Sequence, residues 1–133
     1  MQFVKAFKSL GYHVPNPRQD WSAEKPDGVC ISLWIKEIDW QPSPPSFSLW
    51  SISSPGVNHW ERLPGQTKRT KHIQRAVTEF SGLVDVVLVT GVPGESYGDA
   101  DPWQPSKRKD HIWRVTKFDN ATGFFSAACE KQN

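Results

Sequence analysis

The chain has 133 residues, of which 37% are hydrophobic and 23% are charged, a balance typical of one globular domain. Its formal net charge of +2 excludes the strongly cationic profile of a protein that stays bound to DNA, although it leaves room for a local basic patch. No apolar run approaches the about 20 residues that span a bilayer, and Lys5 and Lys8 interrupt the apolar stretch of an export signal, so we expect a cytoplasmic protein without a membrane segment.

The first third of the chain predicts one helix and one strand. Apolar residues at helical spacing predict a helix over residues 1–11, which Gly11 is placed to end. Prolines favour extended structure over residues 13–28, which close with an Asp-Gly turn signal. Residues 29–40 alternate apolar and polar side chains and predict a strand with one buried face.

The middle of the chain predicts a strand, a helix and a central strand. We expect residues 46–52 to form a strand antiparallel to the first one, joined to it through a rigid proline-rich link. Helical periodicity returns over residues 66–80, whose inward stripe is predicted to be Ile73, Ala76, Val77 and Phe80. Residues 83–92 are the most apolar run and predict a strand at the centre of the sheet.

The last third predicts a long loop followed by a hairpin. The loop covers residues 93–110, and strands over 111–119 and 124–130 are joined by a turn whose residues tolerate left-handed geometry. The order of elements predicts a single α+β domain over 1–133, with a mostly antiparallel sheet of about five strands and two helices packed on one face.

Cys30 and Cys129 are the only cysteines, and both fall in predicted strands. In a reducing compartment they are interpreted as two buried thiols, whereas a disulfide between the strands needs an oxidising compartment.

Patterns for catalysis, cofactors and metals are weak. No setting typical of a nucleophilic serine occurs, so no catalytic residue is predicted. The glycines of "TGVPGESYGD" lack the Lys-Ser/Thr of a phosphate-binding loop and open no predicted helix, which argues against a nucleotide cofactor. The four histidines are too scattered for a zinc site, and no metal is predicted.

Basic residues on the predicted second helix form the first candidate site. Lys68, Lys71, His72 and Arg75 share one face, opposite the apolar stripe. Such a cationic face would meet phosphates, with each contact adding to a salt-dependent affinity. The alternative is an ordinary solvated helix face.

The stretch "YGDADPWQPSKRKDHIW" forms the second candidate site. Pro102 and Pro105 stiffen the flanks of Trp103, and Lys107 and Arg108 follow as cations. An exposed indole there would stack on a base or another planar ligand with little loss of entropy. The alternative is a latch, in which the indole folds inward and fastens the loop to the domain.

Two further residues complete the candidate ligand-binding set. Trp34 lies on the strand face opposite the apolar stripe, where it is either core or part of an open surface with Trp113 beside it. Arg18 lies in the polar, proline-stiffened segment between the first helix and the first strand. Such a segment either carries recognition or clamps the helix to the sheet.

The runs "NPRQDWSAEKPDGVCISLWIKEIDW" and "GLVDVVLVTGVPGESYG" resemble small uncharacterised bacterial proteins of mobile elements, of the type found on integron gene cassettes. The resemblance implies a compact, independently encoded accessory protein that forms a homodimer. It assigns no chemistry to any position.

Three functional hypotheses follow. The first is a non-enzymatic binding protein for nucleic acid or another anionic or planar ligand, and the second is an accessory protein that forms a homodimer or binds a protein partner through its seven tryptophans. The third is a small enzyme with a pocket formed by polar loop residues, namely Arg18, Asp20, Glu95 and Asp99.

Overall fold

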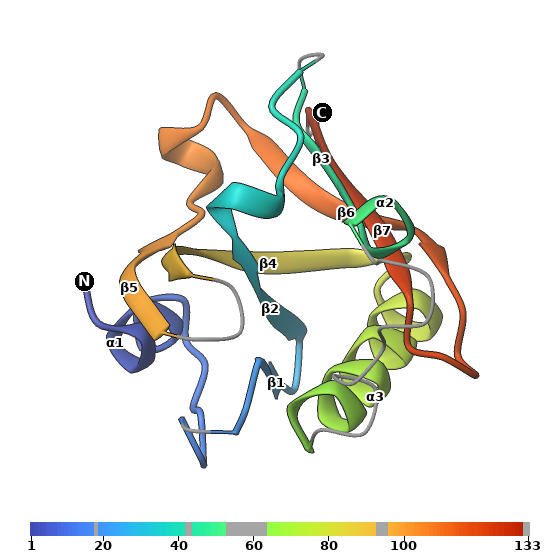
Figure 1. The fold of residues 1–133 in the computed structure, drawn as a ribbon, viewed down its shortest axis with the longest axis horizontal. Helices are drawn as coiled ribbons and strands as arrows, with labels where there is room; N and C mark the ends of the chain where they lie inside the picture. The colour runs from blue at the N-terminus through green and yellow to red at the C-terminus, as the bar shows by residue number, and fades with distance from the viewer. Residues whose placement is uncertain (18, 42–43, 53–63, 93–95, 132–133) are drawn as a thin grey trace.

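The computed structural model describes residues 1–17, 19–41, 44–52, 64–92 and 96–131 (Figure 1). The helices in these ranges are α1 (Phe3–Ser9), α2 (Leu49–Ile52) and α3 (Pro64–Glu79), with short 3-10 turns η1 (Ile35–Glu37) and η3 (Pro105–Lys107). The strands are β1 (Ser22–Lys25), β2 (Gly28–Trp34), β3 (Ser46–Ser48), β4 (Leu83–Val92), β5 (Ser96–Pro102), β6 (His111–Phe118) and β7 (Phe125–Lys131). No helix in the described ranges is long and apolar enough to cross a membrane.

The strands form one mostly antiparallel sheet in the order β1-β2-β4-β6-β7-β3, with β5 paired to β4. Among the ladders of the described residues, only β2–β4 is parallel. The predicted α+β class is confirmed, but the sheet has seven strands instead of about five. The two missed strands are short on apolar residues: β1 forms through its hairpin with β2, and β5 forms because β4 supplies a ladder for it.

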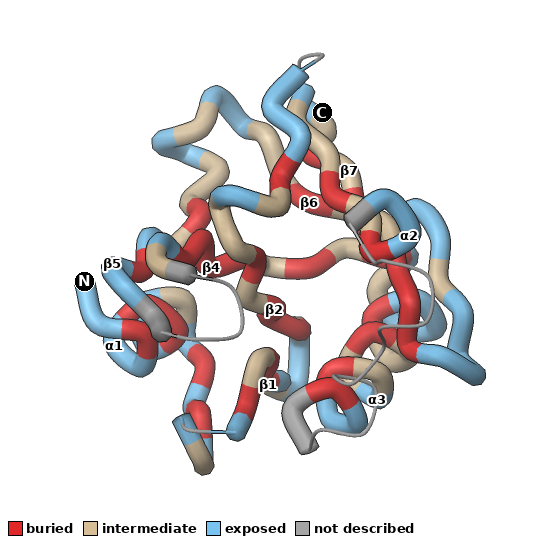
Figure 2. The backbone as a smooth tube through the Cα atoms, in the orientation of Figure 1, coloured by how far each residue is buried: buried red, intermediate tan, exposed pale blue. Residues whose placement is uncertain are grey.

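β4 is the centre of the sheet, as its apolar sequence predicts. Alternate side chains point to opposite faces of a strand. Val86 and Leu88 belong to a core cluster that includes Ile73 of α3, whereas Val87 and Val89 belong to a second cluster that α1 covers. The two helices therefore pack on opposite faces of β4, and the expectation of both on one face is not met. Figure 2 shows buried positions on β2, β4 and β7 and on the helices α1 and α3.

The segment 46–52 differs from its prediction in both structure and pairing. Its strand ends at Ser48 and continues as α2, and it pairs with β7 rather than with β2. Phe47 is buried, with its ring centroid 5.2 Å from that of Phe125. An isolated bridge between Asp39 and Ser46 joins the strand to the segment after β2. Core burial of the Phe47 ring against β7 thus decides the pairing.

α3 confirms the predicted helix, with one change in its inward stripe. Ile73 and Ala76 are fully buried, but Val77 is 40% exposed and its predicted place in the core is wrong. The helix ends as Ser81-Gly82 predicts: both residues have positive φ, and the Gly82 N–H donates to the Ala76 carbonyl at 2.9 Å.

The closing hairpin of β6 and β7 is confirmed, including its turn. Gly123 has a φ of +80°, and its N–H donates to the Asp119 carbonyl at 2.8 Å. Cys30 and Cys129 are free and buried, and they lie in different core clusters, which confirms two buried thiols.

Candidate functional site

Trp103 is latched into the core. Its side chain is only 7% exposed, and its ring meets that of Trp113 edge-on with centroids 5.7 Å apart. The indole Nε1–H donates to the His111 carbonyl at 2.7 Å, and the backbone N–H donates to the Val86 carbonyl at 2.8 Å. The ring thus fastens the loop to β4 and β6. The latch interpretation is confirmed, and the expectation of an exposed stacking platform is wrong.

Arg108 completes this latch. Its guanidinium lies 4.8 Å from the centroid of the Trp103 ring and forms an ion pair with Asp101. Stacking on an aromatic face and pairing with a carboxylate are the two contacts that a guanidinium makes best. Arg108 therefore stabilises the loop. Because Asp101 neutralises much of its charge, Arg108 contributes little free positive charge to the surface.

The turn formed by η3 and the residues after it has a defined shape that leaves its lysines outside. Lys109 and Asp110 both have positive φ, 57° and 62°, which is uncommon for residues other than glycine. The Asp110 N–H donates to the Pro105 carbonyl at 2.7 Å, which closes the turn. Lys107 and Lys109 are exposed. Hydrogen bonds and the latch therefore hold a strained turn that displays two lysines.

A third lysine lies across the β6–β7 ladder from this turn. Lys131 is exposed and pairs in register with His111. The His111 Nδ1 lies 3.0 Å from the carbonyl oxygens of both Arg108 and Lys109, so this nitrogen carries the proton and donates it. We refer to Lys107, Lys109 and Lys131 as the lysine cluster. None of the three has an ion pair among the described residues.

The predicted cationic face of α3 is mostly used inside the molecule. Lys68 pairs with the buried carboxylate of Asp20 at 3.0 Å. Arg75 donates to the carbonyls of Lys25 and Pro26 at 2.9 Å each. Both side chains thus clamp α3 to the segment around β1 and are not free to meet a ligand.

Arg75 makes a further ion pair with Glu79 at 2.6 Å, whereas Lys71 stays exposed without an ion pair in the described ranges. The two predicted cationic groups also lie apart. Figure 1 shows α3 on the opposite side of the molecule from the turn that precedes β6. The two groups therefore do not form one cationic surface.

His72 and Ser22 form a pair that sequence patterns did not reveal. The Ser22 Oγ lies 2.6 Å from His72 Nδ1, and His72 Nε2 lies 3.9 Å from a carboxylate oxygen of Glu24. A serine beside a histidine is the arrangement of an activated nucleophile. Ser22 is buried, however, so a substrate cannot reach its hydroxyl in this structure. The pair joins α3 to β1.

Trp34, the remaining candidate that the structure describes, does not join the loop. Trp34 packs partly buried against the core cluster under α1, whereas Trp113 lies in the cluster under α3. Of the two alternatives for Trp34, packing against the core is the one that the structure shows, and the open surface beside Trp113 is not formed. Arg18 lies outside the described residues, as does Glu95.

Comparisons with known proteins give no further assignment. No family model, no curated protein and no solved structure matches the chain.

Proposed function

We propose that the chain is a small non-enzymatic binding protein that recognises nucleic acid through the lysine cluster. The observation that supports this proposal best is the display of Lys107, Lys109 and Lys131 around a turn that is held by hydrogen bonds and by the buried Trp103. A preformed loop loses little entropy on binding.

Phosphate contacts fit this arrangement better than base stacking does. Unpaired ammonium groups replace the counterions of a phosphate backbone, and the affinity then falls with salt. The indole that would have stacked on a base is buried, so recognition is expected to depend on charge and to be tolerant of sequence. Asp110 is the acidic residue of the turn and limits its net charge.

The proposal is tested by fluorescence anisotropy with mixed-sequence single-stranded DNA and RNA at about 50 and 300 mM salt. We expect binding at low salt and a log–log salt slope of about −2, since each phosphate contact to a single strand contributes about −0.7. The Lys107→Glu and Lys131→Glu variants are each expected to weaken binding at least about threefold and to flatten the slope.

Lys71→Glu is the matched control, because Lys71 is also exposed but lies on α3. The Lys71→Glu variant changes the net charge by the same amount as Lys107→Glu or Lys131→Glu. Its affinity for the nucleic acid is nevertheless expected to stay within about twofold of that of the unmodified protein. Absence of binding at low salt, or an equal loss in the Lys71 variant, would rule out the lysine cluster as a nucleic-acid site.

A further inference from the structure

An exposed tryptophan lies at the same end of the sheet as the lysine cluster. Trp40 follows η1, and its side chain is 43% exposed. The indole Nε1–H donates to the Ile35 carbonyl at 3.3 Å, which ties one edge of the ring to the chain. None of the ring or cation contacts among the described residues involves this indole. An exposed ring held by one edge loses little entropy when a flat group stacks on it.

The ladders place Trp40 near the end of β7 that carries Lys131. A bridge between Asp39 and Ser46 joins the segment after η1 to β3, and β3 pairs with β7. Adjacent strands lie about 4.8 Å apart, so this segment runs about 10 Å from β7. Both pairings are antiparallel, so the segment runs in the same direction as β7, toward Lys131. Figure 1 shows the segment rising between the turn before β6 and the C-terminal end of β7.

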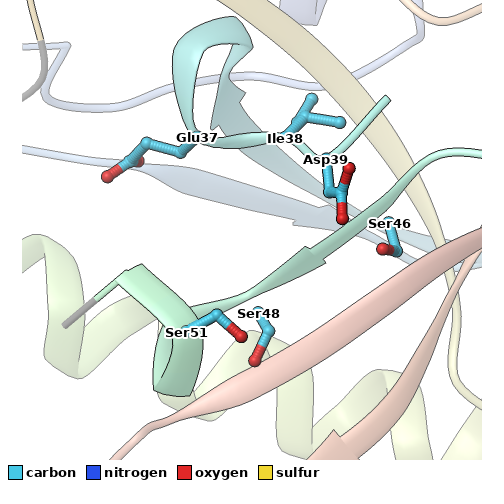
Figure 3. A pocket seen from close by; sticks show the side chains of 6 residues that line it. All are labelled: Glu37, Ile38, Asp39, Ser46, Ser48 and Ser51. Atoms are coloured by element: carbon cyan, nitrogen blue, oxygen red, sulfur yellow. The ribbon is translucent and has the colours of Figure 1, made fainter. Parts of the chain in front are cut away.

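Alternation along the segment decides which way the indole points. Ile38 is buried in the core, whereas Asp39 is exposed. Figure 3 shows these two side chains leaving the segment in different directions, with Asp39 on the side of Ser46. Side chains two residues apart on an extended chain share a side. Trp40 therefore continues the side of Ile38, past the end of the core.

Lys131 leaves the sheet on the same side as Trp40. Cys129, two residues before Lys131 on β7, is buried in the core cluster that also contains Ile38. By the same alternation, Lys131 continues the core side past the end of the core. The Trp40 indole and the Lys131 ammonium group thus share one side and one end of the sheet, and the Asp39 carboxylate lies on the other side.

A flexible strand of nucleic acid satisfies both features at once. Its phosphates can stay near the lysine cluster while an unpaired base turns onto the indole, whereas the bases of a duplex are stacked on one another. We propose that the lysine cluster binds single-stranded rather than duplex nucleic acid, with one base stacked on Trp40. This inference rests on the proposed function and adds the class of nucleic acid. It keeps the tolerance of sequence, because every base has a flat face.

Fluorescence anisotropy with three labelled DNA probes tests the proposal: a strand of about 12 nucleotides, its duplex, and an abasic strand with the same number of phosphates. We expect the normal strand to bind about tenfold more tightly than the abasic strand and more tightly than the duplex. Trp40→Ala should remove the preference over the abasic strand and leave the salt slope unchanged, since the phosphate contacts remain. Duplex affinity should stay within about twofold in this variant.

Trp50→Ala is the matched control. Trp50 is also exposed, but it lies on α2 with its ring centroid 5.6 Å from that of Phe124. This variant should keep the preference for the normal strand. Trp40→Phe should keep most of it, because a phenyl ring also stacks on a base.

The outcomes separate this proposal from the proposed function. Equal binding of the normal and abasic strands with an intact salt slope would overturn the stacking and leave the lysine cluster as a phosphate site. A preference that Trp40→Ala leaves unchanged, as when the indole is buried between two copies of the chain, would overturn it too. Absence of binding to all three probes at low salt would overturn both proposals.

Discussion

At the scale of single residues, the two tryptophans Trp103 and Trp40 have opposite environments although both lie in proline-rich or polar segments. Trp103 is buried against Trp113 and donates its indole proton to a carbonyl. Trp40 is 43% exposed, and its indole donates to the Ile35 carbonyl at 3.3 Å. The environment of a tryptophan therefore depends on what the folded chain places beside it.

Replacing these two residues should separate a structural role from a surface role. Trp103→Ala is expected to lower the free energy of unfolding by about 3–5 kcal/mol, because it leaves a cavity beside Trp113 and frees the loop. Trp40→Ala should cost less than about 1 kcal/mol. Urea denaturation of both variants measures the difference, and a near-neutral Trp103→Ala would contradict the latch.

His72 provides a pH-dependent contribution at the same scale. Burial lowers its pKa below 6.5, with Lys68 and Arg75 lowering it further and the carboxylates of Glu24 and Asp20 acting against them. The unfolded chain therefore takes up a proton at His72 before the folded chain does. The stability that depends on neutral His72 is present above pH 6.5 and is lost as the pH falls toward the folded pKa.

We expect the free energy of unfolding to fall between pH 7.5 and pH 5, and His72→Gln to reduce that slope. His13→Gln is the control, because His13 is exposed. Urea denaturation at several pH values provides the measurement. A slope that His72→Gln leaves intact would assign the pH dependence to other groups.

At the scale of elements, the sequence predicts what depends on local pattern. The helix that became α3, the central strand β4 and the final hairpin follow from periodicity and turn residues, which act over a few positions. The pairing of β3 with β7 and the formation of β5 on β4 depend on partners that local patterns do not identify.

The same distinction explains the candidate site. The cations of α3 were correctly placed on a helix, but the partner of Lys68 is Asp20, which is 48 residues away. Likewise, the charged loop was recognised, whereas the burial of its indole depends on contacts with β4 and β6.

At the scale of the whole molecule, the homodimer remains a prediction, and the structure suggests different anchors for it. Trp103 is buried and cannot serve, whereas Trp40 and Trp50 are 43% and 37% exposed. Large aromatic side chains are enriched at protein interfaces and carry much of their binding energy. These two residues are therefore the expected anchors of self-association.

Multi-angle light scattering of the purified chain at about 100 μM should then give twice the 15.1 kDa mass of one chain. A Trp40→Ser, Trp50→Ser double variant is expected to shift the mass toward that of one chain, because each lost aromatic anchor costs about 2 kcal/mol of binding, or about thirtyfold in affinity. Val77→Ser, an exposed apolar position on α3, should leave the mass unchanged. A monomeric unmodified chain would refute the dimer, whereas dissociation by Val77→Ser would move its interface to α3.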